Sequence, residues 1–391
     1  MANIAGARIT TNITQDRRVV DMSKDIALLD PNAAPFITIT KTIKGGNNIR
    51  KVYNPKFEWL EDDYLGNSTA LSAELTNVAT SVSVDDGSIF RVNDVITIPA
   101  TGENMLVTAI SNNTLTVTRG YGGVAAAAAA ADDVVIIIGN AFKENSLMRD
   151  RLSTKEVAKY NYTQIFRTPI ELSGTEEASK LYGGKDKAYQ RKKALVEHKR
   201  DIALSMYFGQ KKEDTTSGVR RTMGGLLEFI KTGSNIQEFK SGSTGSEVNF
   251  TYKNFVTYVA EPAFRHGSDN KLLIGGPTTM AAIMAWDADK LMTEVGADKT
   301  FGVSVKKLVT PFGTLDMVYD PLLNGDIYGG YGLILDMENI RYAYMEGRDT
   351  KLHTNIQAND QDGVVDEYFT ECSLEVKLPD THFLFTGAYV A

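Results

Sequence analysis

The most informative part of this sequence is SVSVDDGSIFRVNDVITI, residues 81–98. It is followed by MLVTAI at 105–110, TLTVTRGY at 114–121 and VVIIIG at 134–139. Short runs rich in Val, Ile, Leu and Thr are separated by Asp-Gly, Gly-Glu and Asn-Asn turns, a pattern typical of antiparallel strands joined by tight connections. Residues 72–140 are therefore predicted to form a small, self-contained β-barrel or β-sandwich.

The charge of this block sets it apart from the rest of the chain. Residues 72–140 contain seven acidic residues, two arginines (Arg91 and Arg119) and no lysine, so they carry a net charge of −5 out of −7 for the whole chain. An acidic, lysine-free block inside a chain of otherwise mixed charge indicates an inserted domain rather than a repeat.

The composition is that of an ordinary globular protein. The chain has 391 residues, of which 42% are hydrophobic and 23% charged, and this length favours two or three domains. No apolar run approaches the roughly 18 residues of a membrane span, and the N-terminus lacks a signal-peptide profile, so we expect a cytoplasmic protein that contacts no membrane. The single cysteine, Cys372, excludes an intrachain disulfide and a multi-cysteine zinc site.

The segments around the block differ from it. Residues 1–35 contain no aromatic residue and little periodicity, so we expect an arm that lies on a neighbouring molecule. Two runs that alternate loosely like strands, residues 49–63 and 155–167, flank the block on either side. Together they resemble the two legs of one long hairpin that carries the β domain toward its tip.

A long helix is predicted from Asp186 to Tyr207. Apolar residues recur every seven positions there, which favours one buried stripe; its members are Ala188, Leu195 and Ile202, with Tyr189, Val196, Ala203 and Met206 beside them. The segment 185–221 holds eleven basic and five acidic residues, a net charge of +6. Such a segment can face a polyanion, and it can equally be a solvated face or pair with acidic neighbours in an assembly.

The second half of the chain mixes helices and strands. Helices are predicted at 252–265, where Pro262 would kink an interior turn, and at 278–291. Strands are predicted at 271–275, 307–309, 313–319, 332–336, 340–344, 368–378 and 381–390. This order indicates an α+β fold with mixed sheets.

No catalytic, cofactor-binding or metal-binding residue can be assigned. The four histidines (His198, His266, His353 and His382) stand in different elements without metal-ligand spacing and are expected at surfaces or interfaces. The glycine clusters at 120–123 and 329–332 lack the context of a phosphate loop, Asp85-Asp86-Gly87-Ser88 lacks the acidic ladder of a calcium loop, and Ala125–Ala131 is expected to be a surface loop or helical turn. Cys372 lies in a strand-like run, where a buried thiol is the default.

The order of these parts resembles the major capsid proteins of tailed bacteriophages with the Hong Kong 97-type fold. Those proteins consist of an N-terminal arm, an extended loop, a spine helix, a peripheral domain and an axial domain. The stretches that carry the likeness are DIALLDPNAAPF at 25–36, FEW at 57–59, IFRTPIELSGT at 165–175, KRDI at 199–202, MGGL at 223–226 and FGTL at 312–315.

The resemblance implies boundaries for each part. The arm would be 1–41, the extended loop 42–71 and 141–175, the inserted β-barrel 72–140, and the axial domain 270–345. The peripheral domain would combine 176–269 with 346–391 and contain the spine helix at 186–209.

The resemblance also implies a function. The chain would be a structural subunit, not an enzyme, that assembles with itself as hexamers and pentamers into the icosahedral shell around double-stranded DNA. It would assemble in a bacterial cytoplasm and have portal, scaffold or decoration proteins as further partners, with non-specific DNA contact and without a cofactor or metal. The alternatives are another virion component, such as a tail or decoration protein, or an enzyme that uses the polar segment 266–270.

Overall fold

The computed structural model describes residues 35–42, 48–179, 186–216, 218–233, 235–240, 248–286, 293–295 and 306–389. The predicted arm, up to residue 34, lies outside this range. The described chain separates into two compact units, residues 60–158 and the remainder, which are treated in turn.

The β unit contains a six-stranded sheet that closes on itself. Its strands run in the order β3-β8-β5-β6-β7-β4, with bounds β3 Ser68–Ala70, β4 Ser81–Ser83, β5 Asp94–Ile98, β6 Glu103–Ser111, β7 Thr114–Thr118 and β8 Val134–Asn140. The two outer strands are joined by a bridge between Leu71 and Val84. Closure leaves no free sheet edge, so this domain is a barrel rather than a sandwich.

The barrel has its own hydrophobic core. Side chains that point inward alternate with outward ones, as in β5, where Ile96 and Ile98 are buried. The buried cluster contains only residues between Leu71 and Val135, among them Phe90, Met105 and Leu115. The alanine run is an irregular segment in which Ala129 forms a bridge with Leu75, in agreement with the predicted loop.

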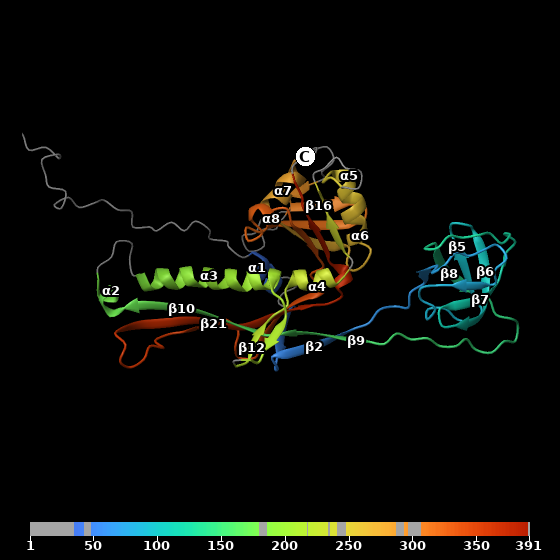
Figure 1. Cartoon of the computed structure of the whole chain (residues 1–391). Helices are drawn as coiled ribbons and strands as arrows, with labels where there is room; N and C mark the ends of the chain where they lie inside the picture. The colour runs from blue at the N-terminus through green and yellow to red at the C-terminus, as the bar shows by residue number, and fades with distance from the viewer. Residues whose placement is uncertain are drawn as a thin grey trace, which may run out of the picture. The chain divides into compact units, whose positions relative to one another are not determined.

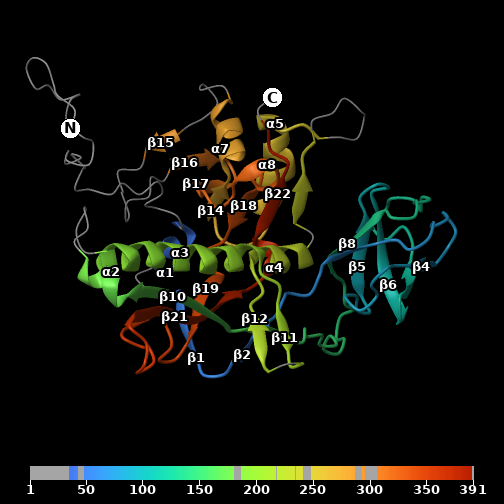
Figure 2. The same cartoon turned by 60° about the vertical axis from the view of Figure 1, so that its left-hand side comes forward.

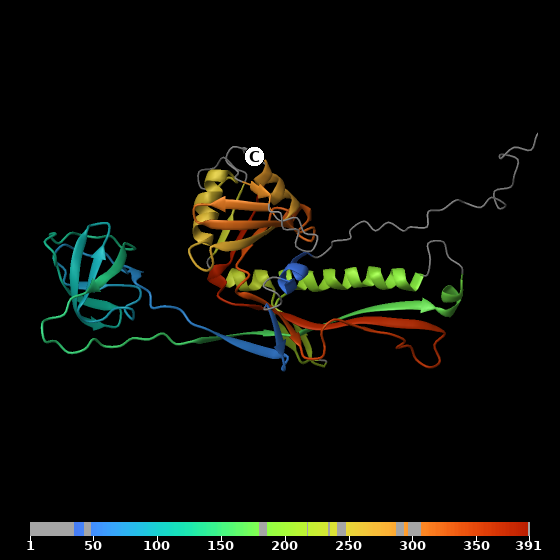
Figure 3. The ribbon, with the colours of Figure 1, turned by 180° about the vertical axis from the view of Figure 1, so that it is seen from behind.

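The other unit contains a five-stranded sheet beneath a long helix. The strands are ordered β1-β19-β21-β10, with β20 on β21; their bounds are β1 Ile49–Val52, β10 Gln164–Ser173, β19 Ile340–Met345, β20 Lys351–His353 and β21 Gly363–Val376. Helix α3, Asp186–Phe208, lies along β10 and β21 in both opposing views (Figures 1 and 3). The predicted long helix is therefore present.

The buried face of α3 differs from the predicted stripe. Its buried residues are Ala194, His198, Ile202, Ala203, Met206 and Tyr207, whereas Leu195 is half-buried and Ala188 is exposed. A straight helix has 3.6 residues per turn, so a strict seven-residue repeat drifts around it, and the buried line instead follows steps of four from Ala194 to Met206. A search for apolar residues missed this buried line because it includes His198.

The same unit contains a seven-stranded mixed sheet, which can be followed in Figure 2. Its order is β13-β22-β18-β14-β17-β16-β15, with bounds β13 Ile236–Glu238, β14 Asn270–Gly275, β15 Thr293–Val295, β16 Lys306–Thr310, β17 Gly313–Tyr319, β18 Gly332–Leu335 and β22 Phe383–Thr386. Neighbouring residues of one strand enter different cores: Leu272 and Ile274 lie in one buried cluster and Leu273 in the other. The sheet is therefore covered on both faces.

Shorter elements complete the fold. The helices are α1 Pro35–Thr42, α2 Gly174–Ala178, α4 Leu226–Thr232, α5 Tyr252–Phe255, α6 Glu261–Ala263, α7 Pro277–Met284 and α8 Gly325–Tyr328, with a 3-10 turn at Pro379–Thr381. Two-stranded sheets pair β2 Lys56–Glu61 with β9 Val157–Tyr162, and β11 Lys212–Asp214 with β12 Arg220–Thr222. A π-helical turn, Val256–Ala260, joins α5 to α6 where Pro262 was expected to disturb the helix.

Some observations differ from the sequence-based expectations. The predicted hairpin legs pair only through β2 and β9, because β1 and β10 join the five-stranded sheet instead. Strand pairing also crosses the predicted domain boundaries, which stay a prediction: β13 and β22 pair with strands of 270–335, and β19 pairs with β21. Finally, α1 belongs to the core and not to an arm, because Phe36 is fully buried against Tyr207. Alternation reveals a strand but not its partner.

Candidate functional surfaces

Buried carboxylates on β21 hold the long helix and its neighbours onto the five-stranded sheet. Each accepts from an arginine of a different part of the chain; the pairs are Arg191–Asp366, Arg167–Glu367, Arg348–Glu371 and Arg50–Glu375, at 2.7, 2.5, 2.5 and 2.6 Å. Hydrogen bonds from Arg167, which outweigh the opposing effect of burial, lower the pKa of Glu367. Only the Arg191–Asp366 pair joins α3, and with it the basic segment, to the sheet. The other three pairs join β10, β1 and the segment after β19 to β21.

Histidine 198 also joins α3 to the sheet. Its ring nitrogens lie 2.8 Å from the Thr168 hydroxyl and 2.7 Å from the Thr370 hydroxyl. Burial lowers the pKa of His198, which favours the neutral ring. The expectation of surface or interface histidines therefore fails for His198 and for His382, both fully buried, while His266 and His353 are exposed.

The outer side of α3 carries positive charge. Lys192, Lys199 and Arg200 are exposed, and within the part of the chain described here they form no ion pair. Residues 192 and 199 stand two helical turns apart on one side, and Arg200 is next to them. We call these three residues the basic face of α3.

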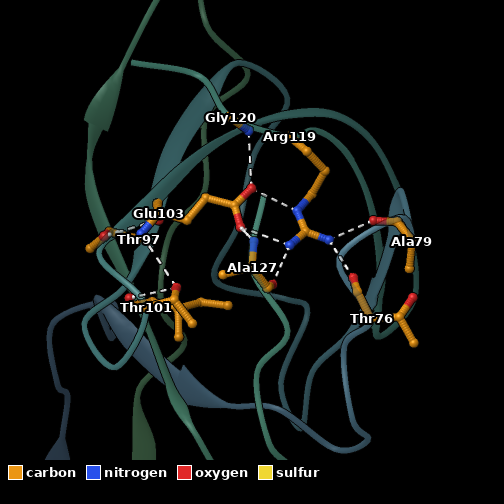
Figure 4. Close-up of polar contacts among 9 residues, drawn as sticks. Thr76, Ala79, Thr97, Thr101, Glu103, Arg119, Gly120 and Ala127 are labelled. Carbon is orange, nitrogen blue, oxygen red and sulfur yellow. Dashed lines mark hydrogen bonds and ion pairs between the residues drawn. The ribbon is translucent and has the colours of Figure 1, made fainter. Parts of the chain in front are cut away.

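The barrel contains one buried ion pair, which the sequence analysis did not single out. Glu103 at the start of β6 is fully buried and accepts from Nε and an Nη of Arg119, both at 2.7 Å, and from the backbone N–H groups of Gly120 and Ala127 (Figure 4). Arg119 also donates to the carbonyls of Thr76, Ala79 and Ala127 at 2.7–2.8 Å. All five N–H groups of the guanidinium are thus used.

This pair substitutes for strand pairing at one end of the barrel. The segments 72–80 and 119–131 have little regular structure, and Arg119 ties their carbonyls to β6 and β7. Burial would raise the pKa of Glu103, but the hydrogen bonds from Arg119, Ala127 and Gly120 outweigh it, so the pKa is lowered. The sequence contained one sign of this ion pair: the acidic block has only two basic residues, and Arg119 is one of them.

A second buried cluster surrounds Lys271, also missed from the sequence. The Lys271 ammonium donates to the carbonyls of Ala263, His266 and Thr381 at 2.6–2.7 Å, and burial lowers its pKa to about 8. A lysine at the head of the apolar run LLIG was the available sign. All three of its protons are used, so the side chain joins β14 to the end of α6, to the segment that follows α6 and to the 3-10 turn at Pro379–Thr381.

The residues that were considered for chemistry make structural contacts in the part of the chain described here. The described residues contain no group of three or more His, Cys, Asp or Glu side chains placed to hold a metal ion. In the segment 266–270, the Ser268 hydroxyl can donate to the Asn270 carbonyl at 2.8 Å or to Oδ1 of Asp336 at 3.0 Å. Cys372 is fully buried, and burial raises the pKa of its thiol to about 12, as expected of a structural cysteine. Among these residues no helix has both the length and the apolar character needed to cross a membrane.

Comparisons with known proteins agree with one another. The family model described as SU10 major capsid protein matches residues 6–389. The major capsid protein of Pseudomonas phage PaMx41 is 24% identical over 364 residues, which cover 90% of this chain and 85% of that protein. A solved chain from the capsid of a native GTA particle has a TM-score of 0.50 and 11% identity, covering 98% of both chains. At that identity the solved structure supports the fold alone.

Proposed function

This chain belongs to the SU10 major capsid protein family, and we propose how its parts build and orient a phage head shell. Its fold is the Hong Kong 97-like capsid fold, of α+β class, and its function is that of a structural shell subunit. The observation that carries this is the family match over residues 6–389, nearly the whole chain.

We assign the parts by their sheets. The five-stranded sheet with α3 would be the peripheral domain with its spine helix, and the seven-stranded sheet with α5 to α7 would be the axial domain. This assignment moves residues 236–263 and 383–386 to the axial domain and 340–345 to the peripheral domain. Strands β2 and β9 with the segments beyond them would form the extended loop that carries the barrel.

The basic face of α3 is proposed to look toward the interior and contact packaged double-stranded DNA. Three exposed cations without an ion pair among the described residues provide a charged surface that needs no base contacts. The barrel, at −5 over residues 72–140, would be repelled by DNA and is proposed to project outward.

Charge reversal tests the inner assignment. The triple variant Lys192→Glu/Lys199→Glu/Arg200→Glu should fold, because all three side chains are exposed, and its purified shells should retain less nucleic acid. Lys351→Glu, also exposed, is the control for a single charge reversal outside the basic face, and Lys192→Glu alone is the variant to compare with it. If variant and parent shells retained equal amounts of nucleic acid, the basic face of α3 would not be a DNA contact.

Protease accessibility tests the outer assignment. Intact shells should be cut within residues 72–140 while α3 stays protected, and disrupted shells should be cut in both. Protection of the barrel with cleavage of α3 would reverse the proposed orientation.

Further partners follow from the family membership as proposals. Portal, scaffold or decoration proteins would meet the shell during assembly in a bacterial cytoplasm. We propose no catalytic role, since the buried charged side chains among the described residues form structural ion pairs and hydrogen bonds.

Deleting residues 1–34 should leave a folded subunit that closes fewer shells, and the cut must precede Pro35 because Phe36 is buried. Normal shells from this truncation would show that the arm is dispensable.

A further inference from the structure

Two large apolar side chains stand uncovered just after the barrel. Leu147 and Met148 are 92% and 95% exposed, although they are adjacent in sequence. Single exposed apolar residues are ordinary, but an exposed pair concentrates apolar surface at one point. Since both side chains lie almost wholly in solvent, neither fills a pocket of its own chain among the described residues.

The local backbone holds this pair in position. A turn closes between the Lys143 carbonyl and the Ser146 N–H at 3.2 Å, with Asn145 at φ +57°, in the left-handed region. Immediately after the pair, Arg149 forms an ion pair with Asp94, which is buried at the start of β5. The Ala141 N–H donates to the Asn93 carbonyl at 2.9 Å before this turn, and the Arg149–Asp94 pair follows it, so the segment that carries the two apolar residues is attached to the barrel on both sides.

The same barrel carries a shallow pocket of about 470 Å³. It is lined by residues 74–77 and 128–130, and Glu74 is the only charged residue among them. Leu75 and Ala129 exchange two backbone hydrogen bonds of 2.9 Å across it, and Arg119 fixes the carbonyls of Thr76 and Ala127. The walls are thus preformed, and the alanine side chains leave room because they end at Cβ.

We propose that Leu147 and Met148 of one subunit dock into the 74–77 and 128–130 pocket of a second copy of this chain. Self-assembly, on which this inference rests, surrounds every subunit with copies of itself. Opposite charges also lie beside the two surfaces: the exposed Arg151 stands three residues after Met148, next to the exposed Asp150, and the pocket carries the exposed Glu74.

The contact joins two different surfaces of identical chains. Such a heterologous contact closes into a ring or continues as a chain, according to the rotation between neighbours. It would connect the barrels of adjacent subunits in addition to contacts made by the capsid fold itself.

Cysteine crosslinking in assembled shells tests the docking. The native Cys372 is fully buried, and Met148 and Ala130 are both exposed, so their replacement should not disturb folding. The double variant Met148→Cys/Ala130→Cys should form, on mild oxidation, a ladder of dimers, trimers and larger species that reductant dissolves. Each single variant can form dimers at most.

A second double variant is the matched control. Ser111 is exposed at the opposite end of the nine-residue β6 from Glu103, roughly 26 Å away at about 3.3 Å per residue. Met148→Cys/Ser111→Cys should therefore give no ladder. If shells form in normal yield but Met148→Cys/Ala130→Cys gives crosslinked species no larger than those of the control variant, the docking is wrong and the proposed function still stands. If the parent forms no shells, the proposed function fails instead, and the same ladder in concentrated soluble protein decides the docking.

Discussion

The hydroxyl of Tyr207 donates a 2.6 Å hydrogen bond to Oδ2 of Asp320, and both side chains are fully buried. Tyr207 stands in the last turn of α3, and Asp320 directly follows β17, so the bond ties the long helix to the seven-stranded sheet. Burial raises the pKa of Asp320, against the opposing hydrogen bonds from Tyr207 and Leu322.

Removing this hydroxyl should destabilise the subunit without changing its surface. Tyr207→Phe leaves one oxygen of a buried carboxyl without its donor, which should cost about 1–3 kcal/mol of unfolding free energy. Thermal unfolding of the unassembled subunit measures this, with Tyr319→Phe, half-exposed at the end of β17, as the control. No loss relative to that control would mean that the bond does not couple helix to sheet.

The barrel should fold by itself. Its buried cluster contains residues from Leu71 to Val135 only, and closure requires Leu71, so the fragment must begin before the predicted 72. Residues 60–158 expressed alone should give dispersed amide resonances and a cooperative unfolding transition of modest stability, as expected at this size. A random-coil spectrum would contradict an independent domain.

The isolated barrel should be sensitive to acid through Glu103. Because its folded pKa is lowered, its contribution to stability is present above the unfolded value of about 4.3 and is lost as pH falls through the folded pKa. Glu103→Gln should flatten this part of the curve of unfolding free energy against pH. Asp132→Asn, at an exposed position, should keep a steeper dependence of unfolding free energy on pH than Glu103→Gln. Identical curves for the two variants would contradict the assignment.

The corrected face of α3 gives an ordered prediction. Ile202→Asp buries a charge without a partner and should cost about 3–5 kcal/mol, enough to prevent soluble expression. Leu195→Asp, at a half-buried position, should cost about 1 kcal/mol and remain soluble. Equal losses of soluble protein would mean that the helix is rotated from the observed face.

The sequence predicted individual helices and strands better than it predicted which strands pair. The alternation at residues 313–319 matches β17, and the helical period identified α3. Nothing local indicates that β22 pairs with β13 and β18, since the chain separation is large and alternation alone fits many partners. His198, Glu103 and Lys271 were missed because polar residues are expected outside the core, and their buried positions depend on donors and acceptors distant in sequence.

Electron microscopy of the purified full-length chain tests the central claim most directly. A major capsid protein of this family should form closed shells of uniform size, built from hexamers and pentamers, under conditions in which the protein is concentrated and its arm is intact. A folded protein that stays monomeric or stops at open rings under those conditions would contradict self-assembly into a head shell.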